Sequence, residues 1–376
     1  MLKIGIEAQR IFRKKKHGMD MVALELIRNL QQIDKTNEYF IYVKEDEDNQ
    51  VILPTDNFNI VKVPSSPYPY WEQVLLPEYA KKDKVDILHC TSNTAPLSIK
   101  SKLVLTLHDI IYLEKLNFTK GTPYQIMGNF YRRWNVPKVV KMASQIITVS
   151  DFEKNTIEKH FGYSDDKVKT IYNGVGKHFK RVDDQAILKQ IKQKYSLPDH
   201  FIFYLGNTDP KKNVAGVLKA LSILKKKGKL KTKLLMLDID RNFLQQQLNN
   251  IADPGLIEDL EFCGYVPNQD LPAIYSQADM FLYPSLRESF GIPILEAMAC
   301  GVAVITSNTS SMPEIALDSA EYCNPFDAES IAAAIDIFQE NIELKNKLAI
   351  KGLERANFFS WTNNAKQTLD IYNSLC

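Results

Sequence analysis

Between Arg287 and Gly301 the chain reads "RESFGIPILEAMACG". The residues just before it, "MFLYPS", predict a buried β-strand, and "PILEAMAC" predicts a helix with Pro293 in its first turn and Gly301 as its C-terminal stop. A strand, a glycine-bearing turn and a helix in this order form the junction at which open α/β sheets bind ligands. We therefore expect a ligand site in this segment.

Two carboxylates flank the turn. The free N–H groups and the dipole at the start of the helix favour an anion such as a diphosphate beside Phe290, Gly291 and Ile292, and Gly291 lets the backbone approach it closely. Glu288 faces the same crevice, and Glu296, in the first turn or so, is placed to accept two hydrogen bonds from a ribose diol. Taken alone, Glu296 could be a favourable charge near the start of a helix, and Glu288 could be a solvated loop residue. The two glutamates together favour a functional site.

Short β-branched runs alternate with amphipathic segments along the whole chain. Such alternation predicts parallel sheets covered on both faces, so we expect an α/β fold, formed twice. The predicted strands are "KIGIEA", "YFIYVK", "NIVKV", "DILHC", "KLVLTLHD", "QIITVS" and "KVKTIYN" before about residue 175, and "FIFYLG", "KLLMLD", "LEFCGYV", "MFLYPS", "AVITS" and "AEYCN" after about residue 200.

The length of 376 residues favours two domains. A charged stretch without a strand pattern, Gly174 to Phe201, separates the halves. We expect a first Rossmann-like domain over residues 1–178, a second over 179–358, and a helix over 359–376 that returns to the first domain.

Composition excludes several classes of protein. A net charge of +2 gives no case for nucleic acid as a partner. The five cysteines are scattered and fit free thiols in a reducing compartment. We expect a cytoplasmic protein, because "MLKIGIEAQR" predicts a strand rather than a signal peptide and no apolar run could span a bilayer. Peripheral contact with the inner face of the membrane stays open.

The glutamate-bearing segment resembles the E-x7-E motif of family 4 glycosyltransferases, which are retaining enzymes. The resemblance is most specific over Gly264 to Ile315, and "YLGNTDPKKN", "ITVSDFEK", "IYNGV", "TLHDIIYLE", "YWEQVLLP" and "DILHC" match in order. It implies the GT-B fold, in which two Rossmann-like domains face each other across a donor/acceptor cleft and a C-terminal helix crosses back to the N-terminal domain.

The resemblance assigns three catalytic roles. Glu288 would hydrogen-bond hydroxyls of the donor hexose near its anomeric carbon. Lys212 would neutralise charge on the departing diphosphate, where electrostatic catalysis has most to offer. His108, at the end of a predicted strand, would hydrogen-bond the transferred sugar, although a lone histidine is more often structural. His89 is a weaker candidate for such a contact.

The family pattern also implies a set of donor-binding residues. Glu296 would bind the nucleotide ribose, and the "GYVP" segment would contact the base, mostly through its backbone. The full set is Gly18, Gly206, Asn207, Lys211, Val266, Ser289, Phe290, Gly291, Ile292 and Glu296.

Two positions depart from the pattern. Asn207 stands where many relatives carry an arginine, so Lys211 or Arg13 would have to replace that phosphate contact. Asp20 stands where relatives often have a second glycine, which changes the loop before the first long helix.

We expect neither a metal site nor a cofactor. "DID" at Asp238–Asp240 resembles a metal-binding D-x-D, but it ends a predicted strand, and Lys212 and the helix amides already meet the donor charge. The expected small-molecule partner is a UDP-, GDP- or ADP-linked sugar donor, and the second partner is a glycan or lipid-linked acceptor.

The predicted function is retaining transfer of a mannose- or glucose-type hexosyl group, in the assembly of cell-surface polysaccharide or lipopolysaccharide. A nucleotide-sugar 2-epimerase of the same fold is the alternative, and a non-catalytic donor-binding module is a further one. A NAD-dependent oxidoreductase is disfavoured because the first strand lacks G-x-G-x-x-G. The stretch "MGNFYRRWNVPK" either shapes the acceptor side or touches lipid head groups.

Overall fold

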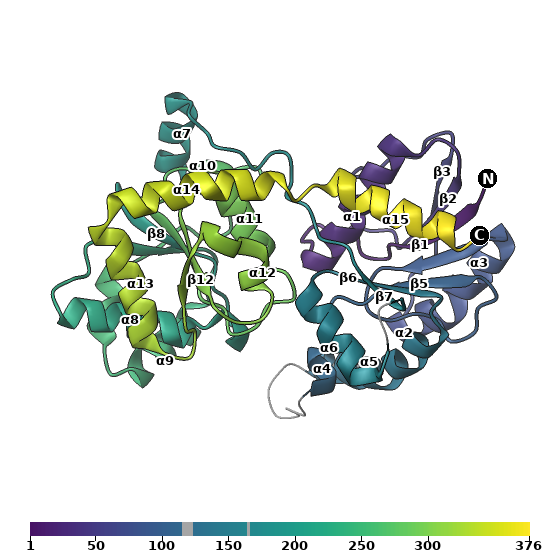
Figure 1. The fold of residues 1–376 in the computed structure, drawn as a ribbon, viewed down its shortest axis with the longest axis horizontal. Helices are drawn as coiled ribbons and strands as arrows, with labels where there is room; N and C mark the ends of the chain where they lie inside the picture. The colour runs from purple at the N-terminus through teal and green to yellow at the C-terminus, as the bar shows by residue number, and fades with distance from the viewer. Residues whose placement is uncertain (115–122, 164–165) are drawn as a thin grey trace. The chain divides into compact units, whose positions relative to one another are not determined.

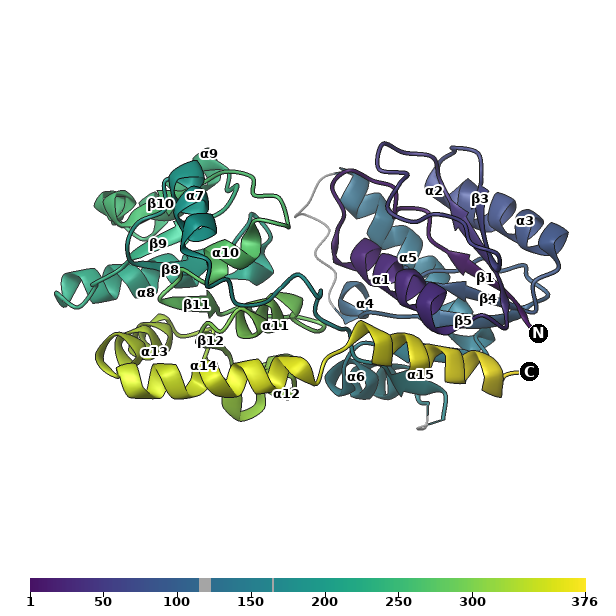
Figure 2. The same cartoon turned by 90° about the horizontal axis from the view of Figure 1, so that it is seen from above.

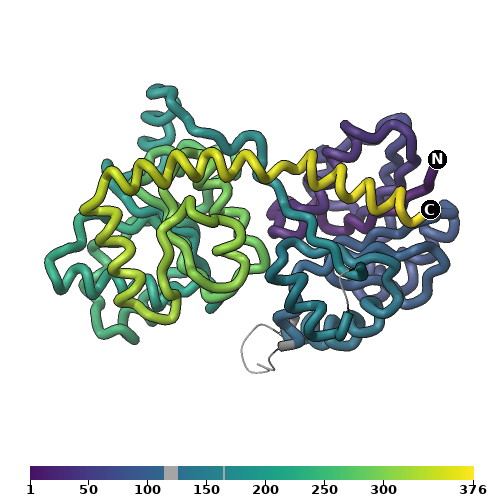
Figure 3. The backbone as a smooth tube through the Cα atoms, in the orientation of Figure 1, coloured from purple at the N-terminus to yellow at the C-terminus, as the bar shows by residue number. Residues whose placement is uncertain are grey.

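The computed structural model describes residues 1–114, 123–163 and 166–376, and the chain forms two compact units (Figure 1). Unit 1 comprises Met1–Gly174 together with Trp361–Cys376, and unit 2 comprises Val175–Ser360. The backbone trace in Figure 3 shows the chain leaving unit 1 once and returning to it with its last helix. Each unit is described by itself below.

Unit 1 is built on a seven-stranded sheet in the order β3-β2-β1-β4-β5-β6-β7. All neighbouring strands are parallel. The strands are β1 (Lys3–Glu7), β2 (Glu38–Val43), β3 (Phe58–Lys62), β4 (Ile87–Cys90), β5 (Lys102–Thr106), β6 (Gln145–Thr148) and β7 (Val168–Thr170).

Helices cover this sheet on both faces, and a separate buried apolar cluster lies on each side of it. The helices are α1 (Gly18–Ile33), α2 (Tyr68–Tyr70), the π-helical segment η1 (Trp71–Leu75), α3 (Leu76–Asp83), α4 (Ile111–Glu114), α5 (Pro123–Met142), α6 (Asp151–Phe161) and α15 (Trp361–Ser374). The strands are apolar almost throughout, as parallel strands buried on both faces must be.

Unit 2 contains a six-stranded parallel sheet in the order β10-β9-β8-β11-β12-β13. Its strands are β8 (Phe201–Tyr204), β9 (Lys233–Met236), β10 (Leu260–Phe262), β11 (Met280–Tyr283), β12 (Val304–Ser307) and β13 (Glu321–Cys323). In both units the order reverses beside the first strand, which makes each sheet doubly wound.

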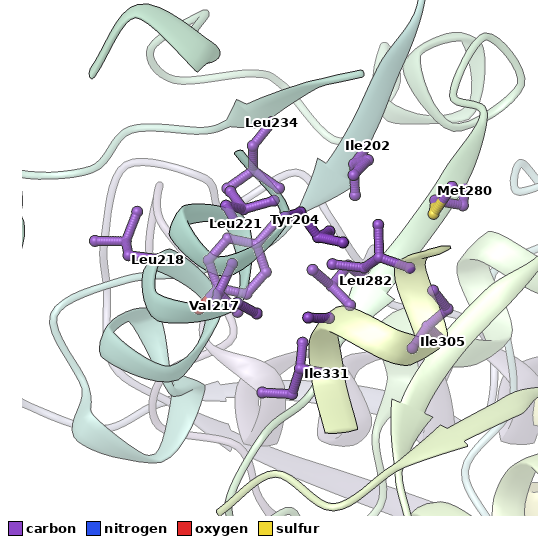
Figure 4. Close-up of a cluster of buried hydrophobic side chains, with 14 of the residues drawn as sticks. Ile202, Tyr204, Val217, Leu218, Leu221, Leu234, Met280, Leu282, Ile305 and Ile331 are labelled. Atoms are coloured by element: carbon purple, nitrogen blue, oxygen red, sulfur yellow. The ribbon is translucent and has the colours of Figure 1, made fainter. Parts of the chain in front are cut away.

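Several helical segments of unit 2, α8 among them, pack around one large apolar cluster (Figure 4). Tyr204 and Leu282, from the central strands, meet Val217 and Leu221 of α8 in that cluster. The helical segments of unit 2 as a whole are α7 (Gln185–Tyr195), η2 (Pro210–Lys212), α8 (Val214–Lys226), α9 (Arg241–Asn250), η3 (Pro254–Asp259), α10 (Leu271–Tyr275), α11 (Ile292–Ala299), α12 (Met312–Ala316), η4 (Leu317–Ser319), α13 (Ala328–Glu340) and α14 (Ile342–Asn357).

The last helix, α15, packs against α1 in unit 1 (Figures 1 and 2). Thr362 donates a hydrogen bond to Asn29 of α1 at 2.9 Å. On the other side, the hydroxyl of Tyr372 lies 2.5 Å from Nδ1 of His89 on β4. The expected returning helix is therefore confirmed, as is the expectation of two parallel α/β sheets.

Candidate active site

The turn between β11 and α11 is held in one conformation. Gly291 has φ +99°, a value that favours glycine, and a Cβ there would lie 3.1 Å from the Ile294 side chain. Ser311 Oγ donates to the carbonyl oxygens of Glu288 (2.9 Å) and Phe290 (3.1 Å). The N–H of Glu288 donates to Ser310 Oγ at 3.1 Å. The loop after β12 thus fixes the turn at the carboxyl end of β11.

The first glutamate of the pattern is bound to a lysine from a different loop. Lys212 Nζ lies 2.7 Å from Glu288 Oε1 and 2.7 Å from the Tyr283 hydroxyl. Tyr283 in turn donates to Glu288 Oε1 at 3.0 Å. Both charged side chains are largely buried, with 16% and 10% of their surface exposed. The structure therefore brings together Glu288 and Lys212, two of the predicted site residues.

Hydrogen bonds hold the two loops in place. Asn213, in the left-handed region at φ 64°, donates through Nδ2 to the carbonyls of Pro284 (3.0 Å) and Pro325 (2.7 Å). The N–H of Leu286 donates to the Lys211 carbonyl at 2.7 Å. The Tyr204 hydroxyl donates to the Lys212 carbonyl at 2.6 Å. The backbone beneath the lysine is fixed, so its ammonium group has a defined place.

Opposing effects set the charge of this cluster. Burial acts to raise the pKa of the Glu288 carboxyl, but the ammonium groups of Lys212 and Lys211 and the hydrogen bonds it accepts outweigh burial, and its pKa ends below its ordinary value. Burial, together with the Glu288 charge, raises the pKa of Tyr283 well above its ordinary value. Glu288 is thus an anion at neutral pH, and Tyr283 stays a neutral donor.

The second glutamate of the pattern lies early in α11. Helix α11 begins at Ile292, so Glu296 is just past its first turn. The Tyr275 hydroxyl donates to Glu296 Oε2 at 3.2 Å. Burial raises the pKa of Glu296 to about 7, and the Tyr275 hydrogen bond opposes that shift only in part. This carboxyl group can therefore change its protonation near neutral pH.

The loop after β8 explains why a glycine stands at Gly206. It also explains the role of Asn207, which departs from the family pattern. A Cβ at Gly206 would lie 2.2 Å from the Tyr204 ring, so a larger residue would displace that ring. Asn207 is exposed, and its Oδ1 accepts the N–H of Asp209 at 2.8 Å. Lys211 Nζ lies 3.8 Å from Asp209 Oδ2. Asn207 thus stabilises the turn that carries the two lysines.

The segment after β10 contains Val266, which was predicted to lie near the nucleobase. Gly264 has φ +66°, and its carbonyl accepts the N–H of Asp238 at 3.1 Å. Val266 is buried. Asp240 of the "DID" sequence caps α9 by accepting the N–H of Phe243 at 2.6 Å. In the described ranges, no three His, Cys, Asp or Glu side chains are grouped so that they could hold a metal ion.

In unit 1, the two candidate histidines differ in their hydrogen bonds. His108 follows β5, and its Nε2 donates to the Thr91 carbonyl at 3.0 Å. Burial lowers the pKa of His108, against the opposing effects of Thr91, Asp109 and Asp20. His89 has Thr106 Oγ1 2.7 Å from Nε2 and Tyr372 at Nδ1, and it is fully buried. Both ring nitrogens of His89 therefore have partners within unit 1, whereas the His108 ring bonds to Thr91 through Nε2.

The structure at the start of α1 accounts for Asp20, the second position that departs from the family pattern. Gly18 opens this helix, and a Cβ there would meet nothing within 4 Å. Asp20 is buried, and its Oδ2 accepts the N–H of His17 at 3.0 Å. The carboxylate of Asp20 therefore caps the helix, as acidic residues in the first turn do.

Several site residues were not found from the sequence. In the sequence Tyr283 is only the end of a predicted buried strand, and Asn213, Ser310 and Ser311 carry no signal that distinguishes them from ordinary loop residues. The sequence also did not reveal a pocket of about 150 Å³ in unit 1, at the ends of β1 and β2. Its lining residues are Gln9, Arg10, Arg13, Lys44, Asp46, Ser66 and Tyr68.

Comparisons with known proteins agree for both units. Residues 187–355 match the family model "Glycosyl transferases group 1", and residues 17–177 match "Glycosyltransferase Family 4". The chain is 32% identical over 247 residues to the O-antigen chain mannosyltransferase B of Escherichia coli, covering 65% of this chain and 64% of that protein.

A second relative is longer. The chain is 29% identical over 279 residues to the serotype-specific mannosyltransferase WbdA of Escherichia coli, covering 73% of this chain but 34% of that protein. The matches thus span between about a third and two thirds of these relatives' lengths. Among solved structures, the sucrose-phosphate synthase of Thermosynechococcus elongatus superposes with a TM-score of 0.78 at 17% identity, over 100% of this chain and 99% of that one, which confirms the GT-B fold.

Proposed function

The chain belongs to glycosyltransferase family 4, and from this premise we propose that it transfers a mannose-type hexosyl group from a nucleoside-diphosphate sugar to a hydroxyl group of a growing polysaccharide. The names of its relatives, an O-antigen chain mannosyltransferase and a serotype-specific mannosyltransferase, support the sugar and the product class. The observation that carries the proposal is the contact of Lys212 with Glu288 beside the start of α11.

The geometry of unit 2 supports the proposed place of the donor. The N–H groups of the first helical turn lack acceptors within the helix, so the diphosphate would lie at Gly291 and Ile292. Lys212, with Lys211 close by, would hold the same phosphates. Glu288, an anion, accepts hydrogen bonds from sugar hydroxyls, and Glu296 accepts them from the ribose. The base would lie against the backbone near Val266.

In the proposed reaction, the bond between the anomeric carbon and the diphosphate oxygen breaks, and a bond from that carbon to the acceptor oxygen forms. The electron pair of the broken bond leaves with the diphosphate, whose growing charge Lys212 stabilises. The acceptor hydroxyl gives its proton to a phosphate oxygen on the same face, so the configuration is retained. His108 binds a hydroxyl of the transferred sugar through Nδ1, since Nε2 is engaged by Thr91.

We propose that this transfer needs no metal ion. The positive charge that a metal would bring to the diphosphate is supplied by Lys212, by Lys211 and by the dipole of α11. Residual activity after dialysis against EDTA, compared with a sample to which magnesium is restored, measures this directly. Equal rates are expected, and a rate that returns only with magnesium contradicts the proposal.

The acceptor and its place are part of the same proposal. In the described ranges, none of the helices has both the length and the apolar surface required to cross a bilayer. We propose that the protein works in the cytoplasm, at the inner face of the membrane, on a glycan or lipid-linked glycan.

A 2-epimerase of the same fold is the competing function, and one assay separates the two. The purified protein is incubated with UDP-, GDP- and ADP-linked mannose and glucose, with and without an extract of lipid-linked glycans. The transferase releases nucleoside diphosphate only when acceptor is present. An epimerase interconverts the sugars without acceptor, and a binding module does neither. Thermal unfolding with each donor identifies the base, since a hundredfold excess over Kd stabilises the fold by about 2.7 kcal/mol.

A further inference from the structure

The cavity of about 150 Å³ at the ends of β1 and β2 carries more positive than negative charge. Arg10, Arg13 and Lys44 line it, against one carboxylate, the exposed Asp46. All strands of this sheet are parallel, so the cavity lies along the same edge of the sheet as His108, which follows β5. Ligands of open α/β sheets bind at this edge, and converging cations favour an anion there.

Two of these cations and one hydroxyl group are available to a ligand. Lys14, beside the cavity in the sequence, lies 3.3 Å from Glu47 Oε2, but Arg13 and Lys44 form no ion pair with a carboxylate of the described ranges. Ser66 also lines the cavity, and its Oγ is shielded from solvent without a hydrogen-bond partner in the same ranges. A shielded polar group without a partner is costly, so a ligand that accepts its hydrogen bond would be stabilised.

The aromatic ring that lines the cavity, Tyr68, is already covered. The guanidinium carbon of Arg10 lies 4.8 Å from the centre of this ring. Tyr131 packs against it at nearly a right angle, with the ring centres 5.9 Å apart. A pyranose ring needs apolar surface for its C–H groups, and the other lining residues are polar or charged. The lining therefore suits a compact anion such as phosphate better than a neutral sugar ring.

A buried carboxyl group holds Tyr68 in place. Glu72, in the π-helical segment η1, is 0% exposed, and its Oε1 accepts the Tyr68 hydroxyl at 2.6 Å. Its Oε2 accepts Gln73 Nε2 at 3.0 Å and the hydroxyl of Tyr131. π-Helical turns are rare and occur frequently at functional sites. The ring on which Arg10 lies is thus fixed before any ligand binds.

The loop after β4 connects this cluster to His108. Thr94 Oγ1 lies 2.8 Å from the Tyr68 hydroxyl. Asn93 Oδ1 accepts the N–H of His108 at 2.7 Å, and the Thr91 carbonyl accepts Nε2 of the same histidine at 3.0 Å. One short loop therefore sets the place of the cavity relative to the histidine proposed to contact the transferred sugar.

We propose that this cavity binds a phosphate group carried by the acceptor, with Arg10, Arg13 and Lys44 supplying the charge and Ser66 donating a hydrogen bond. Arginine binds phosphate through two parallel N–H groups, and lysine contacts it as a point charge. The inference rests on the proposed function and narrows it. The acceptor is then a glycan joined to its carrier through phosphate, with the phosphate and the reacting hydroxyl close enough for both to contact unit 1.

The first experiment measures binding without turnover. The full-length protein is titrated in a calorimeter with mannose 1-phosphate, with inorganic phosphate and with methyl mannoside, at constant ionic strength. We expect both phosphates to bind, and the neutral sugar to bind at least about tenfold more weakly. Equal binding of the neutral sugar and the sugar phosphate would overturn the proposal.

Matched variants locate the phosphate. Arg13→Gln with Lys44→Gln should weaken its binding at least about tenfold. Lys14→Gln with Lys62→Gln removes two charges whose side chains are 78% and 61% exposed, and it should change nothing. Lys212→Met should also leave binding unchanged. Loss of binding in Lys212→Met, with none in the cavity variant, would assign the phosphate to unit 2. Circular dichroism confirms that each variant is folded.

The second experiment separates a phosphate of the acceptor from the diphosphate of the donor. Lipid-linked glycans are compared with the same glycans freed of lipid and phosphate by mild acid. The unaltered protein should have a KM at least about tenfold lower for the phosphate-bearing acceptor, and Arg13→Gln with Lys44→Gln should lose this preference at an unchanged donor KM. A donor KM that rises instead would assign the cavity to the donor.

The two proposals can fail separately. Phosphate binding is measured without donor, so it can be absent from a protein that transfers sugar, and the cavity proposal alone is then wrong. A protein that binds phosphate through Arg13 and Lys44 but releases no nucleoside diphosphate with acceptor would contradict the proposed transfer.

Discussion

Lys212 and Glu288, which are 76 positions apart in the sequence, form a direct ion pair of 2.7 Å whose charged groups are mostly shielded from solvent. The lysine comes from the turn after β8 and the glutamate from the turn after β11, and these strands are neighbours in the sheet. The pair therefore lies where the carboxyl ends of two central strands meet.

Replacing either partner should abolish most activity. We expect Lys212→Met and Glu288→Gln each to lower kcat about 10²- to 10³-fold, the range found when one electrostatic contact to a transition state is removed. In a double-mutant cycle on stability, the two substitutions should couple by about 1–3 kcal/mol, because each single change leaves a shielded charge unpaired.

An exposed pair in the same unit is the control. Lys227 and Glu329 are 2.8 Å apart, with side chains 54% and 62% exposed. The same cycle on this pair should give less than about 1 kcal/mol and no change in kcat. A comparable coupling in both pairs would mean that shielding does not distinguish the Lys212–Glu288 pair.

Glu296 should make stability depend on pH. Burial raises its pKa to about 7 in the folded protein from an ordinary value of 4.5. The folded state therefore holds a proton that the unfolded chain has released, and this contribution to stability is lost as pH rises from about 4.5 to about 7.

The variant Glu296→Gln removes that titration. Relative to the unaltered protein, it should gain stability between pH 5 and pH 8, on the order of 2 kcal/mol, as measured by urea unfolding. If the carboxylate binds the ribose, donor affinity of the unaltered protein should also rise through this interval and that of the variant should not. Parallel stability curves for the two proteins would contradict the assignment.

Gly291→Ala should lower both stability and donor affinity. An alanine at φ +99° is strained, and its Cβ would press on Ile294, so we expect a loss of about 1–3 kcal/mol in thermal unfolding. Because the strain acts on the turn that would hold the diphosphate, Kd for the donor should rise more than tenfold in calorimetry. A variant with unchanged Kd would place the diphosphate elsewhere.

The variant Gly18→Ala should lower activity without lowering stability. Its Cβ would meet no neighbour, and alanine is favoured over glycine in helices, so stability should stay the same or rise by up to about 1 kcal/mol. If the backbone at this position approaches the substrates, kcat/KM should nevertheless fall at least tenfold. A fully active variant would show that this glycine has no part in binding.

The fold was predictable because its signals are local. Every predicted strand is present, since runs such as "KIGIEA" and "FIFYLG" are too short and too β-branched for helices and are bounded by turn residues. The E-x7-E segment could be placed for the same reason, as its strand, glycine and helix follow one another directly.

The rest of the site depends on contacts between distant loops. Nothing near Tyr283 in the sequence indicates that its hydroxyl meets Lys212, and nothing near Ser311 indicates that it binds the Glu288 carbonyl. The protonation of Glu296 is also invisible in the sequence, because it follows from how deeply the chain buries the carboxyl group. These properties arise only after the sheet has formed.

The return of α15 to unit 1 has a consequence for how the protein is made. A ribosome releases residues of unit 1 first, but Thr362 and Tyr372, which contact α1 and β4, emerge only after all of unit 2. Until then the nascent first unit keeps part of its apolar surface uncovered. Its completion must wait until unit 2 and α15 have been synthesised, so chaperones that guard such surfaces have time to act on it.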